Sequence, residues 1–126
     1  MYFNGAASQA EKGIKISGLN YVTGDSDQIE EMAIVAKVKL NSSASNHNND
    51  QRILLSFDRS AVFRFSIGSD QVNGSAGKPV FHFTNSQGMH DISSSYSGDL
   101  RDDKWHVVSV SFKANQAGGL KFYIDG

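Results

Sequence analysis

Carboxylates are the residues of this sequence whose chemistry could support hydrolysis, because glycoside cleavage uses two of them, about 5 to 9 Å apart, flanking the bond. The chain contains three glutamates, Glu11, Glu30 and Glu31, and none belongs to a paired strand motif. Asp102 and Asp103 are adjacent and precede a predicted strand, where neighbouring residues face opposite sides. A solvated turn is the favoured interpretation of this pair, so the sequence predicts a protein that is not an enzyme.

Aspartates near predicted strand ends form a second group of interest, because calcium prefers carboxylate and carbonyl oxygens. The candidate calcium ligands are Asp58, Asp70 and Asp91. None of them belongs to a spaced motif such as an EF-hand loop, so a turn-forming role is favoured over a ligand role. The four histidines show no zinc-ligand spacing, and the chain has no cysteine.

A binding surface is the third kind of site that the residue types allow, because sugars bind through aromatic faces and planar polar groups. The candidate ligand-binding residues are Asp58, Arg59, Arg64, His82, Asn85 and Tyr123. For each one, an ordinary polar position on the solvent-facing side of a sheet is the competing interpretation. Trp105 is expected to lie in the core or to pack against a sheet.

Length and charge limit the classes of protein. The 126 residues suit a single domain, 1–126, and 39% hydrophobic residues can form a core. Twelve basic and thirteen acidic residues are scattered along the chain, which argues against a nucleic-acid partner. No apolar run approaches the roughly 20 residues of a membrane span, and residues 1–10 do not resemble a signal peptide.

Alternating hydrophobic residues predict many short strands. The clearest case runs from Ile34 to Leu40, with the even-numbered residues facing inward. The same pattern places Ile53, Leu55 and Phe57 inward on one strand and Phe63, Phe65 and Ile67 inward on the next. A short turn at 58–60 joins these two strands, so we expect a hairpin.

Further strands are expected in the second half of the chain. One begins at Pro79 with Phe81 and Phe83 inward and His82 outward, since proline suits a strand start. Two more, 105–112 and 120–125, flank a glycine turn at 118–119. Their inward residues are predicted to be Val108, Val110, Phe112, Leu120, Phe122 and Ile124. Segments 41–50, 68–78 and 84–103 are expected to be loops, and 2–5 and 14–16 to be short strands.

Three segments of the chain resemble the laminin G-like and concanavalin A-like lectin/glucanase superfamily. The first is Tyr2-Phe3-Asn4-Gly5, and the second is the strand 32–40. The most specific is the segment 103–112, which contains Trp105-His106-Val107-Val108, followed by the segment 121–126, which ends in Tyr123-Ile124-Asp125-Gly126; the second motif comes about a dozen residues after the first strand. The resemblance implies an all-β fold, an antiparallel jelly-roll-like β-sandwich. His106 is expected to pack or form bonds at a strand end.

The resemblance also implies a function. It predicts a recognition or adhesion module that binds a glycan or a protein partner within a larger extracellular or surface protein, and calcium is the one candidate cofactor. Family members continue for several strands beyond the Tyr-Ile-Asp-Gly segment. We therefore expect the sheets to be completed by a continuation of the polypeptide or by a partner chain that adds strands.

Two other functions remain open from the sequence. The domain could be a structural or assembly element of a surface or virion-like structure. It could instead be an accessory module of a glycoside-active enzyme. The glucanases of the superfamily carry Glu-x-Asp-x-Glu spacing on one strand, and no strand of this sequence has it.

Overall fold

The computed structural model describes residues 30–41, 52–57, 63–68 and 75–126. Within these ranges the chain forms seven strands and no helix: β1 (Glu31–Lys39), β2 (Arg52–Phe57), β3 (Phe63–Ile67), β4 (Pro79–Asn85), β5 (Gly88–Ser93), β6 (Trp105–Lys113) and β7 (Leu120–Ile124). The described residues thus contain no helix that is long and apolar enough to cross a membrane. The short strands predicted at 2–5 and 14–16 lie outside the described residues.

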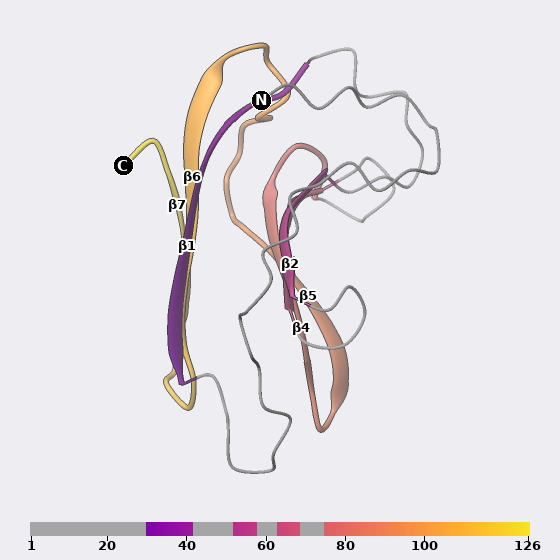
Figure 1. The fold of residues 1–126 in the computed structure, drawn as a ribbon, viewed down its shortest axis with the longest axis vertical. Coiled ribbons are helices and arrows are strands. Elements are labelled where there is room, and N and C mark those ends of the chain that lie inside the picture. The colour runs from indigo at the N-terminus through magenta and orange to yellow at the C-terminus, as the bar shows by residue number, and fades with distance from the viewer. Residues whose placement is uncertain (1–29, 42–51, 58–62, 69–74) are drawn as a thin grey trace.

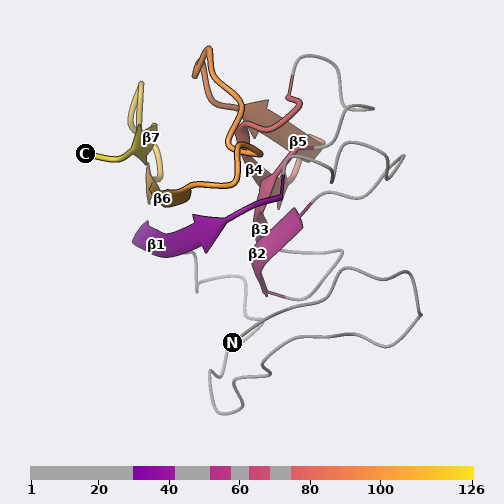
Figure 2. The same ribbon diagram turned by 90° about the horizontal axis from the view of Figure 1, so that it is seen from above.

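The strands form two antiparallel sheets that face each other. One sheet has the order β1-β6-β7 and the other has the order β2-β3-β4-β5. Figure 1 shows β1, β6 and β7 as one layer and β2, β4 and β5 as the other, and Figure 2 shows the same two layers from above. This arrangement confirms the all-β prediction and has β-sandwich character.

The hydrophobic core lies between the two sheets. Phe65, Ile67 and Phe81 come from the four-stranded sheet, while Val108 and Val110 come from the three-stranded sheet, and all are at most 1% exposed. Aromatic rings connect the layers: the ring centroids of Phe81 and Phe112 are 6.1 Å apart, and those of Phe83 and Phe112 are 6.3 Å apart. Leu100, from the segment before β6, is also fully buried in this cluster.

Most predicted inward positions are confirmed. The even-numbered residues of β1 are the less exposed ones and pack against the core, as do the inward residues predicted for β3, β4, β6 and β7. The β2–β3 hairpin is also confirmed, since the two strands pair antiparallel. The turn between β6 and β7 forms as expected. Lys113 donates its N–H to the carbonyl of Gly119, and Gly118 has a φ of 69°.

Two predictions about strands are wrong. The segment 84–103 is not one loop, because Gly88–Ser93 forms β5 and pairs with β4 across a tight turn. Leu55 was predicted to point inward, but a bulge between Ile53 and Leu55 changes the alternation of β2. Leu54 packs against the core as a result, and Leu55 is 37% exposed.

Candidate functional site

Three of the predicted site residues lie side by side on the four-stranded sheet. Arg64 on β3 is opposite His82 on β4, and His82 is opposite Asp91 on β5, so the three side chains share the face turned away from the core. His82 Nδ1 is 2.7 Å from Asp91 Oδ1, and Arg64 Nη2 is 3.7 Å from the same oxygen. The sheet register therefore brings together two predicted ligand-binding residues and one predicted calcium ligand.

The row of Arg64, His82 and Asp91 is poorly exposed for a binding surface. His82 is on the outward face as predicted, but it is only 8% exposed, and Ser66 and Val80 on the same face are fully buried. Since His82 Nδ1 donates to Asp91, it cannot also accept from Arg64, which lies 3.5 Å away. Arg64 Nε is buried without a hydrogen-bond partner. The row is a cross-strand polar contact of the sheet rather than an open face.

The other predicted ligand residues lie elsewhere. Asn85 is in the β4–β5 turn, where its Oδ1 accepts from the N–H of Gln87 and lies 3.0 Å from His90 Nε2. Tyr123 is on β7 of the other sheet, so it cannot share a site with Arg64 and His82. Asp58, Arg59 and Asp70 lie outside the described residues. Among the residues that are described, no three His, Cys, Asp or Glu side chains form a group that could hold a metal ion.

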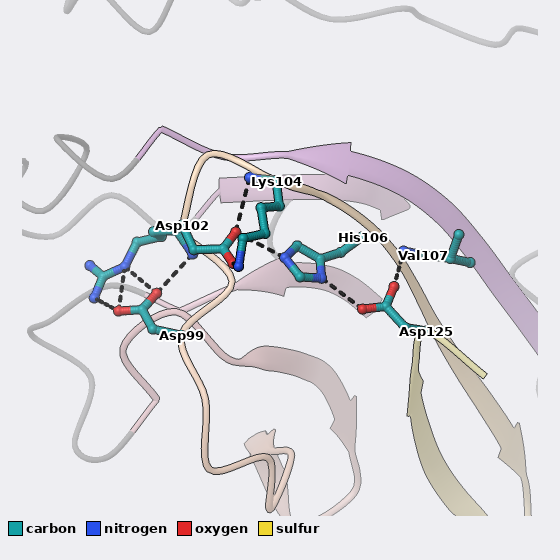
Figure 3. Close-up of polar contacts among 7 residues, drawn as sticks. Asp99, Asp102, Lys104, His106, Val107 and Asp125 are labelled. Carbon is teal, nitrogen blue, oxygen red and sulfur yellow. Dashed lines mark hydrogen bonds and ion pairs between the residues drawn. The ribbon is translucent and has the colours of Figure 1, made fainter.

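A histidine held between two carboxylates is the most developed polar contact of the structure. His106 Nδ1 is 2.8 Å from Asp125 Oδ2, and His106 Nε2 is 3.0 Å from Asp102 Oδ1 (Figure 3). The ring is buried, with 11% of its side chain exposed. Asp125 Oδ1 also accepts from the N–H of Val107, at 2.8 Å. We call Asp102, His106 and Asp125 the His106 clamp, and it confirms that His106 forms bonds at a strand end.

Local backbone geometry places the two carboxylates of the clamp. Asp102 lies in the turn before β6, where its Oδ1 accepts from the N–H of Lys104 and its Oδ2 is 3.4 Å from Lys104 Nζ. Asp125 follows β7 with a φ of 57°, a left-handed conformation that aspartate tolerates better than most residues. The backbone N–H of Asp125 donates to the carbonyl of Val107, so β7 is tied to β6 by side chain and backbone together.

The charges of the clamp stabilise one another. Hydrogen bonds to Asp125 and then to Asp102 raise the pKa of His106 above its usual 6.5. The hydrogen bond from His106 is the largest cause that lowers the pKa of both Asp102 and Asp125 below the usual 3.8. The arrangement therefore favours the protonated over the neutral imidazole, and the ionised over the protonated form of each carboxylate.

These shifts predict how the clamp contributes to stability across pH. Because the pKa of His106 is raised in the folded protein, its contribution to the free energy of unfolding is complete below pH 6.5. This contribution is lost as the pH rises through the pKa of His106 in the folded protein. The lowered aspartate pKa values give a contribution that is complete above pH 3.8 and is lost at lower pH. We expect the melting temperature of the chain to exceed that of the His106→Gln variant most between these two limits.

The measurement is thermal melting of both proteins from pH 3 to pH 9. The Asp125→Asn variant serves as a control, because removing the largest cause of the raised pKa of His106 should move the upper limit towards pH 6.5. A constant difference between the wild type and His106→Gln across this range would show that the charge of the ring has no part in stability.

Another aspartate, Asp99, organises the segment before β6. Arg101 donates to both oxygens of Asp99, from Nε at 2.9 Å and from Nη2 at 2.6 Å. The side-chain hydrogen bond from Arg101 lowers the pKa of Asp99 more than any other cause. The N–H of Leu100 donates to the carbonyl of Gly77, which anchors this segment beside the start of β4.

The outer face of the three-stranded sheet presents exposed apolar side chains. Val35 is 70% exposed, Trp105 62%, Tyr123 47% and Val107 42%. Trp105 was predicted to lie in the core or to pack against a sheet, and the first of these two alternatives is therefore wrong. The alternation that buries Val108 and Val110 also places Trp105 and Val107 on the opposite face, so this signal was present in the sequence.

Register places these side chains close together. Val35 is opposite Ser109, which is opposite Tyr123, while Lys37 is opposite Val107 and Lys39 is opposite Trp105. Lys37 Nζ lies 5.5 Å from the centre of the Trp105 ring, a distance at which a cation is attracted to the ring face. We call the outer side chains of β1, β6 and β7 the outer face; its members are Glu31, Ala33, Val35, Lys37, Lys39, Trp105, Val107, Ser109, Ser111, Lys113, Lys121 and Tyr123.

The described part of the chain thus contains one open apolar face and, at its edge, one buried histidine clamp. The two features adjoin, since His106 lies between Trp105 and Val107 in β6. In comparisons with known proteins, no family model, no curated protein and no solved structure matches the chain.

Proposed function

We propose that this chain is a non-catalytic recognition module that binds a protein partner through the outer face of β1, β6 and β7. The observation that carries the proposal is the group of exposed apolar side chains on that face, Val35, Trp105, Val107 and Tyr123. Contiguous exposed apolar surface is typical of interaction sites, and solvent contact with it is unfavourable. A β-sandwich of the laminin G-like type would present such a face as part of an extracellular or surface protein.

The aromatic residues of the outer face suit a protein interface. Trp and Tyr are enriched among the residues that contribute most to protein binding, because they bury a large area with little loss of conformational freedom. Trp105 and Tyr123 stand on strands of a regular sheet, so their backbones are already ordered before a partner arrives.

The charge of the outer face indicates the kind of protein that it fits. The face carries four lysines and one glutamate, whereas the whole chain has a net charge of −1. Lys113 Nζ lies 3.6 Å from Glu31, which leaves Lys37, Lys39 and Lys121 as the uncompensated charges of the face. A partner with acidic residues around an apolar centre would therefore be complementary to it.

A protein partner fits the outer face better than a glycan does. Sugar sites pair an aromatic ring with planar hydrogen-bonding groups that fix the hydroxyls. Between Trp105 and Tyr123 the face offers valine, serine and lysine side chains, and it contains no Asn, Gln, Arg or His. Val35 and Val107 contribute apolar area that a sugar hydroxyl cannot use.

The test is selection of binders from a displayed library of random peptides. The library is selected on the wild-type chain and counter-selected on the Trp105→Ala variant. We expect the enriched peptides to combine acidic with apolar residues, to lose affinity about 30-fold or more on Trp105→Ala, and to bind more weakly at high salt. Val35→Ala should weaken the same peptides.

Met89→Ala is the matched control, because Met89 on β5 is 70% exposed, as Val35 is, but belongs to the other sheet. It should leave the affinity unchanged. If no peptide survives the counter-selection, or if Met89→Ala weakens binding as much as Val35→Ala does, the outer face is not the site.

A glycan array probed with the same chain, first with calcium and then with a chelator, separates the competing function. Binding to defined glycans that disappears in Trp105→Ala would replace the protein partner with a carbohydrate. Calcium dependence of that binding would in addition support a calcium site near a strand end.

A further inference from the structure

The two carboxylates of the His106 clamp determine the protonation state of the ring. An ionised carboxylate can only accept hydrogen bonds, so each ring nitrogen must carry a hydrogen to bond the carboxylate that faces it. The neutral imidazole has one N–H and the imidazolium has two. The contacts of 2.8 Å and 3.0 Å from the two nitrogens can both be hydrogen bonds only when the ring is charged.

The clamp joins three segments of backbone next to the outer face. Asp102 holds the turn before β6, His106 belongs to β6, and Asp125 lies beyond the last residue of β7. Asp125 also forms two hydrogen bonds with the backbone of Val107. Its carboxylate accepts from the N–H of Val107, and its own backbone N–H donates to the carbonyl of Val107. The residues before and after His106 are Trp105 and Val107, whose side chains project onto the outer face.

We propose that His106 is a positioning residue for the outer face: its imidazolium, held between Asp102 and Asp125, fixes the backbone that presents Trp105 and Val107 to a partner. A neutral ring has one N–H for two carboxylates, so loss of the ring proton breaks one of the two bonds and loosens either the turn or the end of β7, whose carboxylates then keep only their contacts with Lys104 and Val107. Partner binding is therefore strong when His106 is charged and weakens as the pH rises. This inference rests on the proposed function of the outer face, but its structural part can be tested without a partner.

Among the residues that the structure describes, no other group around His106 would replace its role. On β1 the residue opposite His106 is Val38, which is uncharged. The turn before β6 contributes Asp102, with Lys104 paired to it and Asp103 beside it, and the segment after β7 contributes Asp125. Lys37 and Lys39 are on the outer face, on the other side of the sheet from the ring.

The test uses Trp105 as a reporter, because it is the single tryptophan of the chain. Time-resolved fluorescence anisotropy of the full chain is recorded from pH 5 to pH 9, and the protonation of His106 is followed by NMR in the same samples. We expect the amplitude of fast local motion of Trp105 to rise with pH, with a midpoint equal to the pKa of His106 measured by NMR.

Variants distinguish a positioning role from a general loss of structure. Asp125→Asn should move both midpoints to lower pH by the same amount, and His106→Gln should abolish the transition. His90→Gln, on β5 of the other sheet, should leave it unchanged. If His106→Gln fails to fold, the wild-type and His90→Gln titrations still decide the matter. A transition absent from the wild type, or one with a midpoint different from that of His106, overturns the inference.

A second readout connects the clamp to binding. The affinity of a peptide selected on the outer face should fall about fivefold or more between pH 6 and pH 9 for the wild type, and should change little for His106→Gln. If the Trp105 transition occurs but no peptide binds the face, the positioning role of His106 stands and the proposed function fails. If peptides bind with the same affinity at both pH values, the coupling of His106 to binding is wrong.

Discussion

Replacing Phe81 with alanine is expected to lower the free energy of unfolding by about 3 to 5 kcal/mol. Phe81 is 1% exposed and stands at the centre of the aromatic cluster between the sheets. Its ring centroid is 6.1 Å from each of Phe63, Phe83 and Phe112, and Phe112 belongs to the opposite sheet. Truncation removes buried apolar area and leaves a cavity that the two rigid sheets cannot close.

The measurement is urea unfolding of the full chain. Domains of this size are stable by only about 5 to 15 kcal/mol, so a loss of this size would be a large fraction of the total. Phe81→Leu, which retains most of the buried volume, should cost less. Val35→Ala, at an exposed position on the outer face, should change stability by about 0.5 kcal/mol or less. Equal effects of Phe81→Ala and Val35→Ala would mean that the sheets do not pack through this cluster.

Replacing Gly77 with alanine is expected to cost about 2 to 5 kcal/mol, because two separate penalties apply. Gly77 has a φ of 64°, a conformation that L-amino acids with a side chain disfavour. A Cβ at this position would also overlap the carboxylate of Asp99. Asp99 is fixed by Arg101, so it cannot move away without breaking that ion pair. The change therefore disrupts the start of β4 and the segment before β6 together.

Gly118 provides a matched control for the backbone term. It has a similar φ of 69°, and nothing lies within 4 Å of a Cβ built there, so Gly118→Ala should show the conformational penalty alone. The Gly77→Ala and Asp99→Ala double-mutant cycle isolates the overlap. We expect Asp99→Ala to be less harmful in the Gly77→Ala background than in the wild type. An additive cycle, with equal effects of the two glycine changes, would show that Asp99 does not restrict this position.

Local pattern was sufficient to predict the strands that border the core. In β1 and β6, alternation places alternate side chains on the buried face, because the backbone of a strand has a period of two. The same rule identified the inward residues of β3 and β4. The hairpin of β6 and β7 was predictable too, since glycines in the connecting turn permit left-handed backbone conformations.

The errors arose where local pattern is weak. β5 shows no hydrophobic alternation: it lies at the end of the four-stranded order, and all six of its residues are polar, small or exposed. Its pairing with β4 supplies the stability that its own sequence does not. The prediction for Leu55 was wrong because a bulge shifts the alternation of β2. The residue types of β2 do not predict this bulge.

The sequence by itself determined the strands that border the core, though not β5, and which of their faces is apolar, because both follow from the alternation of residues close in the chain. Only the tertiary structure decided which distant residues meet. The register of β3, β4 and β5 aligned Arg64, His82 and Asp91, and the pairing of β6 with β7 brought Asp125 to His106. Trp105 is exposed because no described element packs on the outer face, a property of the assembled sheets rather than of the residue.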